Sequence, residues 1–321
     1  MIVTGGTGYV GSSLVPRLIE GGYRVRTLDF CPENSISSEH NTDSFEAVTG
    51  DIRDRNVVSK TLEGADAVVH LAALLPGPHS QFPAEMIYDV NYRATCSLVD
   101  LCKEKAVKRF VFSSSCGSYG VFDKSEPATE DDEQIPTSTY TESKIKAEQY
   151  ISKRNSSTFH PTILRFATIF GRSPKMTFNS LVNALVYDAC VDKHVTVYGP
   201  ASWRPLVHID DVATAILLVL GAPLPLVSCQ VFNVGSDTMN YQKIEIVQAI
   251  KKIFPEVCIE IKNDLADSRT YKCSFKKISE LLGFKTVKSL EEGIAEMRKM
   301  MEKEKIADPT LKVQRSYGHF L

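Results

Sequence analysis

Short apolar runs alternate with amphipathic segments along the first half of the chain. Ile2 and Val3 precede a glycine-rich stretch, residues 12–20 follow the period of a helix, and residues 23–28 alternate as a strand does. Further strands are predicted at residues 45–49, 66–71 and 108–113, with a helix at 90–105. Strands that alternate with helices indicate a parallel sheet covered on both faces. We therefore expect an α/β fold with a doubly wound parallel sheet.

Beyond residue 171 the pattern becomes less regular, because prolines interrupt it at positions 174, 200, 205, 223 and 225. Helices are still predicted at residues 179–188, 210–220, 241–253 and 290–302. We interpret this part as a smaller, mixed C-terminal domain that binds substrate at the carboxyl edge of the sheet. The expected boundaries are 1–171 for the sheet domain, to which 205–236 returns, and 172–204 with 237–321 for the substrate domain.

Composition narrows the choice of partners. The 321 residues include 37 basic and 39 acidic ones, a balance that gives no reason to expect nucleic acid or an anionic membrane surface. The eight cysteines form no C-x-x-C pair and fit neither a zinc site nor a disulfide framework. We therefore expect free thiols, no metal and a cytoplasmic location, with no signal peptide and no membrane span.

A glycine-rich loop follows the first predicted strand and precedes the first predicted helix. Gly6 begins a G-x-G-x-x-G match that ends at Gly11, and Gly5 extends it. In this context the motif is the dinucleotide fingerprint of a Rossmann fold, in which glycines admit a pyrophosphate to a helix N-terminus. Asp29 ends the next strand, where a carboxylate binds ribose hydroxyls and favours NAD over NADP. The alternative is a structural glycine turn in another doubly wound fold.

Tyr140 is the one tyrosine of the twelve that is followed four residues later by a lysine, Lys144. On a helix these two residues share a face, and a nearby ammonium makes a phenolate accessible as a base. Ser115 ends a predicted strand upstream, at the edge of the sheet where ligands bind. We expect Ser115 to bond the substrate hydroxyl that Tyr140 deprotonates. The alternative is a capping serine run beside a tyrosine packed in the core.

The glycine loop and the Ser115, Tyr140 and Lys144 set match those of a known family. The chain resembles the extended short-chain dehydrogenase/reductases, and among them the nucleotide-sugar epimerases and dehydratases. The matching stretches follow the family order between residues 2 and 285: Thr4–Gly11, Gly50–Ile52, His70–Ala73, Val90–Asn91, Phe112–Ser115 with Tyr119–Gly120, Tyr140-x-x-x-Lys144, Leu164–Phe166, Phe170–Gly171, Trp203–Asp211 and Val231–Gly235.

The resemblance implies roles for individual positions. Ser115, Tyr140 and Lys144 correspond to the catalytic residues. The residues that correspond to NAD contacts are Gly5, Gly8, Tyr9, Val10, Asp29, Asp51, Ile52, Leu71, Ala72, Ala73, Asn91, Tyr140 and Lys144. Those that correspond to substrate contacts are Ser115, Thr168, Asn179, Val197, Tyr198, Arg204 and Arg269. Arg204 corresponds to an arginine that clamps the substrate diphosphate, a role suited to a guanidinium fork; the alternative is a surface ion pair with Asp210 or Asp211.

Two departures from the family bear on the substrate and the reaction. Thr168 stands where many 4-epimerases carry an asparagine, which puts UDP-galactose itself in doubt. Cys116 and Gly117 stand where sugar 4,6-dehydratases carry an Asp-Glu acid/base pair, so water elimination by that route lacks its groups. Residues 74–83 are expected to border the sugar, and His79 within them is more typical of a solvated loop histidine.

The resemblance implies an NAD-dependent epimerase that acts on a nucleotide-activated sugar at C4, with Tyr140 as base. Two alternatives remain: a reductase or dehydrogenase of a keto-sugar or another small carbonyl compound, and a cofactor-binding regulatory protein without turnover. Relatives commonly form homodimers through the helix after Val90 and the helix of Tyr140. A stripe of apolar residues on these helices either forms that interface or faces the protein's own core: Ala94, Leu98, Leu101, Cys102 and Ile145.

Overall fold

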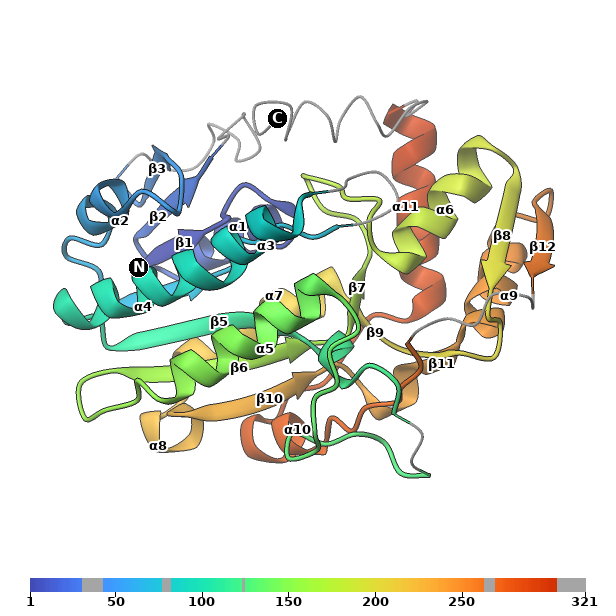
Figure 1. Cartoon of the computed structure of the whole chain (residues 1–321). Coiled ribbons are helices and arrows are strands. Elements are labelled where there is room, and N and C mark those ends of the chain that lie inside the picture. Colours follow the sequence, from blue (N-terminus) through green and yellow to red (C-terminus); the bar gives the residue numbers. More distant parts are fainter. Residues whose placement is uncertain (31–42, 77–81, 123–124, 263–268, 305–321) are drawn as a thin grey trace.

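The computed structural model describes residues 1–30, 43–76, 82–122, 125–262 and 269–304. Cys31, His79 and the tail 307–321 therefore lie outside the described residues. The main sheet has seven parallel strands in the order β10-β6-β5-β4-β1-β2-β3 (Figure 1). They are β1 (Ile2–Thr4), β2 (Val25–Asp29), β3 (Phe45–Thr49), β4 (Ala67–His70), β5 (Arg109–Ser115), β6 (His160–Phe166) and β10 (Gln230–Val234).

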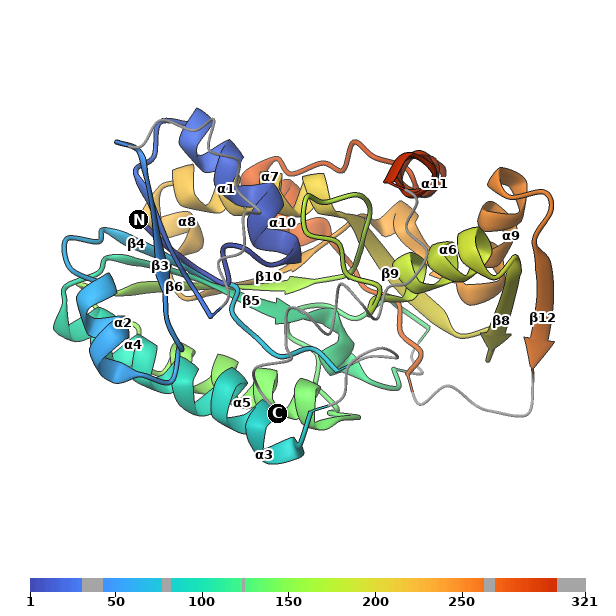
Figure 2. The same ribbon diagram turned by 90° about the horizontal axis from the view of Figure 1, so that it is seen from above.

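Helices cover both faces of this sheet (Figure 2). One face bears α1 (Tyr9–Glu20), α7 (Ile209–Gly221), α8 (Leu224–Val227) and α10 (Lys276–Leu282). The other bears α2 (Arg55–Thr61), α3 (Ala84–Tyr88), α4 (Ala94–Glu104) and α5 (Thr139–Ser152), with a π-helix (Asp89–Arg93) between α3 and α4 and a 3-10 turn (Cys116–Tyr119) after β5. The expected doubly wound parallel sheet is confirmed.

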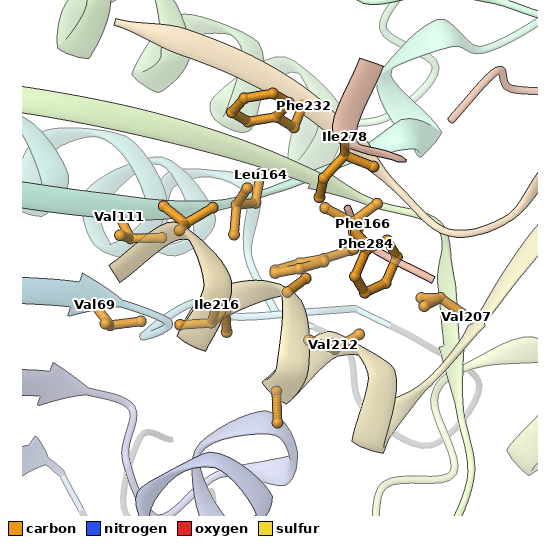
Figure 3. Packing of buried hydrophobic residues seen from close by; sticks show 14 of the residues in the cluster. Val69, Val111, Leu164, Phe166, Val207, Val212, Ile216, Phe232, Ile278 and Phe284 are labelled. Atoms are coloured by element: carbon orange, nitrogen blue, oxygen red, sulfur yellow. The ribbon is translucent and has the colours of Figure 1, made fainter. Parts of the chain in front are cut away.

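The sheet is held by apolar side chains that project from its strands onto these helices. Figure 3 shows Leu164 and Phe166 of β6 facing Val212 and Ile216 of α7, with Ile278 of α10 close by. A second cluster fills the space between the opposite face and α4 and α5. Because parallel strands here are buried on both faces, their apolar runs are nearly continuous rather than alternating. The carboxyl ends of the strands are thereby held rigidly at one edge.

A smaller, mixed part lies beyond that edge and has a core of its own. One sheet orders its strands β11-β9-β7, with β9 parallel to β7 and antiparallel to β11, and a second pairs β8 with β12. The elements are β7 (Thr168–Phe170), α6 (Leu181–Val191), β8 (His194–Tyr198), β9 (Trp203–His208), a 3-10 turn (Asp237–Met239), β11 (Asn240–Gln242), α9 (Lys243–Ile253), β12 (Cys258–Lys262) and α11 (Leu290–Glu304). The expected smaller mixed unit is therefore present. The returning segment is divided between the two parts, because β9 belongs to this smaller sheet and β10 to the main one.

The apolar stripe considered as a dimer interface faces the protein's own interior. Ala94, Leu98, Leu101 and Cys102 are at most 4% exposed and belong to the core below α4 and α5. Ile145 is also buried, at 8% exposed. The stripe thus gives no support to a homodimer, which stays a prediction from the resemblance. Among the described residues, no helix combines the length and the apolar character needed to cross a membrane.

Candidate active site

A cavity of about 1340 Å³ opens at the carboxyl edge of the main sheet. Its walls come from the residues that end or follow β1, β2, β3, β4, β5 and β6, and from the segment 173–181 of the smaller part. Single small-molecule sites commonly occupy about 300–1,000 Å³. This cavity therefore has room for two ligands side by side, at the place where open parallel sheets bind them.

The glycine loop forms one end of the cavity, and its shape requires glycine. Gly5 has φ +69°, and a Cβ on it would lie 2.7 Å from the backbone nitrogen of Ala72. A Cβ on Gly11 would lie 2.4 Å from the carbonyl oxygen of Gly5. The backbone thus turns directly into α1, whose first residues Tyr9, Val10 and Gly11 line the cavity. The first N–H groups of a helix have no partner within the helix. Such a helix N-terminus fits the pyrophosphate of a dinucleotide.

Asp29 lies at the end of β2 and faces this loop. Its carboxylate accepts hydrogen bonds from the backbone N–H groups of Thr7 at 3.0 Å and Phe30 at 2.8 Å. Asp51 also lines the cavity but forms an ion pair with Arg53 at 2.5 Å. Although burial opposes ionisation, the hydrogen bonds from Arg53 hold the pKa of Asp51 below its usual range. Asp29 therefore has the position expected of the ribose ligand, while Asp51 already has a cationic partner.

The three expected catalytic residues meet at the centre of the cavity. Tyr140 and Lys144 stand one turn apart on α5, and the Nζ atom of Lys144 lies 5.9 Å from the centroid of the Tyr140 ring. Lys144 donates a hydrogen bond to the carbonyl oxygen of Ser113 at 2.7 Å. Ser115 follows at the tip of β5, and its hydroxyl accepts from the N–H of Gly117 at 3.0 Å. Ser115, Tyr140 and Lys144 thus line the same cavity.

Burial acts in opposite directions on the pKa values of Tyr140 and Lys144. It lowers the pKa of Lys144 to about 7, against the attraction of Glu148, which raises it. It raises the pKa of Tyr140 to about 12, and the nearby phenol of Tyr271 adds to this effect. The protein alone therefore keeps Tyr140 neutral at physiological pH. A further positive charge, such as that of an oxidised nicotinamide, is needed to favour the phenolate.

Arg204 marks the other end of the cavity and is 3% exposed. Its guanidinium donates to the carbonyl oxygens of Trp203 at 2.7 Å and Arg269 at 2.5 Å, and lies 5.6 Å from the centroid of the Tyr271 ring. The alternative of a surface ion pair is wrong, because Arg204 is buried while Asp210 pairs with Arg17 at 2.6 Å. Arg269, Thr168 and Asn179 line the same end.

Three expected contact residues lie away from the cavity walls. Asn91 is fully buried, and its amide accepts from the N–H of Leu74 at 2.8 Å and donates to the carbonyl of the same residue at 2.9 Å. Asn91 therefore does not line the cavity itself, but it holds the backbone of Leu74, which does. Val197 is buried in the core of the smaller part, and Tyr198 is 41% exposed beside Lys262. Both belong to β8, which pairs with β12 at the far end of the molecule (Figure 1).

A hydrogen-bonded junction, which the sequence analysis missed, joins the glycine loop to the smaller part. The hydroxyl of Tyr9 donates to the carbonyl of Gly171 at 2.7 Å and accepts from the amide of Asn183 at 3.1 Å. The hydroxyl of Ser173 donates to the carbonyl of Tyr9 at 2.7 Å. More than 160 residues separate these partners in sequence, so no local pattern could have revealed the junction. Tyr271 and Lys175 are further lining residues missed in the same way.

Comparisons with known proteins agree with this geometry. The model of the NAD-dependent epimerase/dehydratase family matches residues 1–235. A UDP-glucose 4-epimerase of Lactobacillus helveticus is 30% identical over 271 residues, which cover 79% of this chain and 81% of that protein. A solved UDP-glucose 4-epimerase of Thermotoga maritima, in complex with UDP-glucose, superposes with a TM-score of 0.81 at 26% identity over 94% of this chain and 98% of that one.

A dTDP-glucose 4,6-dehydratase of Streptomyces venezuelae, solved with bound NAD, has a TM-score of 0.83 at 25% identity over 95% of this chain and 97% of that one. Because the similar proteins include both epimerases and a dehydratase, the similarity alone does not decide between the two reactions. The cofactor is common to the family, and the glycine loop with Asp29 fits it. The chain belongs to the NAD-dependent epimerase/dehydratase family and is an enzyme of this type, with NAD as its cofactor.

Proposed function

We propose that this enzyme epimerises a nucleoside diphosphate sugar at C4, with Tyr140 as the base. The observation that supports this most is the order of groups along one cavity. All of these groups line the same cavity. In the strand order of the main sheet, Asp29 on β2 and the glycine loop after β1 come before Ser115 on β5, and Arg204 follows on β9 of the smaller part. A dinucleotide beside Asp29 and a diphosphate-linked sugar beside Arg204 would meet at Tyr140. The Thermotoga maritima relative, which has a similar fold, was solved with UDP-glucose bound.

Each of these residues has a separate role in the proposed reaction. Gly5 and Gly8 allow the approach of the cofactor pyrophosphate, and Asp29 accepts from its ribose hydroxyls. When bound, NAD would supply the acceptor of the C4 hydride, the donor that gives it back to the opposite face of C4 after the sugar has turned, and a positive charge that favours the phenolate. Tyr140 takes the proton of the C4 hydroxyl as the C4 carbon is oxidised, and returns it after the sugar has turned over. Ser115 hydrogen-bonds the same oxygen, and Lys144 stabilises the phenolate.

The site favours epimerisation over elimination of water. Elimination needs an acid and a base beside the strand-end hydroxyl. Here the next two residues are Cys116, which is fully buried and donates to the carbonyl of Arg165 at 3.1 Å, and Gly117, which has no side chain. A Cβ at Gly117 would also lie only 3.1 Å from the Ser115 hydroxyl. Of the described residues, the two that follow Ser115 therefore supply neither an acid nor a base for the elimination.

The test is turnover of UDP-hexoses and UDP-hexuronates with no cofactor added, followed by assignment of the product stereochemistry. Interconversion of C4 epimers without net NADH is the expected result, and the Tyr140→Phe variant should lose it. Turnover that begins only when stoichiometric NADH or NADPH and a keto-sugar are supplied would replace the proposal with a reductase. Binding without any turnover, in wild type and Tyr140→Phe alike, would indicate a regulatory protein.

A further inference from the structure

The helix that bears the catalytic pair has a third buried polar residue in register. Tyr140, Lys144 and Glu148 follow one another at four-residue intervals on α5 and so share a face. Glu148 is only 3% exposed and does not line the cavity. Its carboxylate forms an ion pair with Arg165 of β6 at 2.7 Å and accepts a hydrogen bond from the hydroxyl of Ser114. An ionised group lies buried directly behind the catalytic wall.

Arg165 is held by the interior and not by the cavity. Its Nη1 atom donates to the hydroxyl of Tyr119 at 2.9 Å and to the carbonyl of Glu130 at 3.1 Å. Tyr119 in turn donates to the amide oxygen of Asn233 on β10 at 2.9 Å. The side chain of Arg165 is 6% exposed and does not line the cavity. The pair of Glu148 and Arg165 is therefore built into the protein and is not a ligand site.

The tip of β5 is attached to α5 at two consecutive residues. Lys144 donates to the carbonyl of Ser113, and Ser114 donates to Glu148. Ser115 is the next residue and contributes the hydroxyl that faces the substrate. These two hydrogen bonds immediately before Ser115 restrict both the distance of the strand end from α5 and its rotation. The distance between Ser115 and the α5 residues is thus set by Lys144 and Glu148 together.

We propose that Glu148, held by Arg165, is a positioning residue of the active site, which orders the tip of β5 through Ser114 and places a negative charge behind Lys144. The inference rests on the proposed function, because it assigns Glu148 a part in keeping Tyr140 usable as a base. A buried ion pair contributes little net stability compared with apolar residues of the same volume. Its presence behind the catalytic wall is therefore better explained by its effect on that wall.

The groups around Lys144 leave Glu148 as its source of negative charge among the described residues. His70 of β4 interacts electrostatically with Lys144, but burial lowers its pKa to about 3, so it is neutral. On β5, Phe112 and Ser113 contact Lys144 and carry no titratable group. The attraction of Glu148 raises the pKa of Lys144, against the larger effect of burial. Without Glu148, Lys144 would lose its proton more readily and would no longer favour the phenolate of Tyr140.

Three variants of the NAD-loaded enzyme test this inference. Glu148→Gln removes the negative charge, and Ser114→Ala removes only the hydrogen bond between Ser114 and Glu148. The double variant Glu148→Met with Arg165→Met replaces the ion pair by apolar side chains. The ionisation of Tyr140 is followed by ultraviolet absorbance of its phenolate, as the difference from Tyr140→Phe. In Glu148→Gln and in the double variant, we expect this titration to move to higher pH and kcat at neutral pH to fall about tenfold or more, with KM changed by less than about threefold. Ser114→Ala should lower kcat and leave the titration in place.

An unchanged phenolate titration in both charge-removing variants would overturn the inference, whatever happens to kcat. The double variant decides the matter if Glu148→Gln alone fails to fold, because it removes Arg165 together with Glu148 and so leaves no unpaired buried guanidinium. The optical titration needs no substrate. If the wild type epimerises nothing, the proposed function fails, while the titration still reports on the link between Glu148 and Tyr140.

Discussion

Lys144 is expected to make the folded protein less stable while it serves catalysis. The side chain is 2% exposed, and burial lowers its pKa to about 7 from an ordinary value of 10.5. At neutral pH the folded state must therefore either keep a poorly solvated ammonium or release its proton. Replacing Lys144 by Met retains the length of the side chain and removes the charge. We expect Lys144→Met to be more stable than the wild type and to be inactive, a trade-off typical of active sites.

The magnitude follows from the pKa. The gap between 10.5 and about 7 corresponds to about 5 kcal/mol, at about 1.4 kcal/mol per pKa unit. The variant leaves the Ser113 carbonyl without its donor, which costs about 1–3 kcal/mol. The net gain in the free energy of unfolding at pH 7 is therefore about 2–4 kcal/mol.

The sign of the pH dependence is fixed by the direction of the pKa change. Because the folded pKa lies below the unfolded one, the unfolded wild type binds more protons between about pH 7 and pH 10.5. The wild type therefore gains stability from this group as the pH rises through that window. The advantage of Lys144→Met should shrink by about 3 kcal/mol between about pH 7 and about pH 9.5. Other groups titrate alike in both proteins and cancel in the difference.

The assay is urea unfolding of both proteins, followed by circular dichroism and performed after NAD has been removed, since bound cofactor adds its own stabilisation. Lys146→Met is the matched control: Lys146 lies two residues further along α5, is 44% exposed at its side chain and pairs with Glu142. It should change the free energy of unfolding by about 0.5 kcal/mol or less. A Lys144→Met variant that is no more stable than the wild type, or whose gap is the same at both pH values, would refute the reasoning.

Three further predictions concern cofactor and substrate. Tyr9→Phe breaks the hydrogen bonds to Gly171 and Asn183, so it should lower the free energy of unfolding by about 1–2 kcal/mol and speed the release of NAD. Equal NAD release rates for the variant and the wild type in dialysis would contradict a role for the junction. Asp29→Asn removes the charge that repels a 2′-phosphate, so the ratio of Kd for NADP to Kd for NAD should fall about tenfold or more, and an unchanged ratio would argue against Asp29 as ribose ligand. Arg204→Met should raise KM about 10- to 100-fold with kcat nearly kept, whereas a loss confined to kcat would place Arg204 at the chemistry and not at the diphosphate.

The local signals in the sequence predicted what depends on near neighbours in the chain. The sequence predicted β3 at residues 45–49 as found, and the other strands and helices that it proposed lie within a few residues of observed elements. It proposed no bounds for several others, among them β6, β10, β12, α2 and α10. The main errors were at element starts. Residues 12–20 predicted a helix that in fact begins at Tyr9, because Gly8 already stands in extended conformation as its N-cap. The helix expected at 90–105 starts as a π-helix at Asp89, which apolar periodicity does not report.

The meeting of Ser115, Tyr140 and Lys144 with the glycine loop in one cavity could also be foreseen, because a strand end, a glycine loop and a Tyr-x-x-x-Lys pair are each local patterns whose meeting place is set by the parallel sheet. Their catalytic roles stay predictions. What only the tertiary structure decided depends on residues distant in sequence. It placed Val197 and Tyr198 on a strand outside the cavity and turned Asn91 inward. It also joined Tyr9 to Gly171 and buried Glu148 against Arg165 behind the catalytic wall. Burial and pairing depend on which surfaces the folded chain brings together, so the pKa values of Tyr140 and Lys144 belong to the fold and not to the motif.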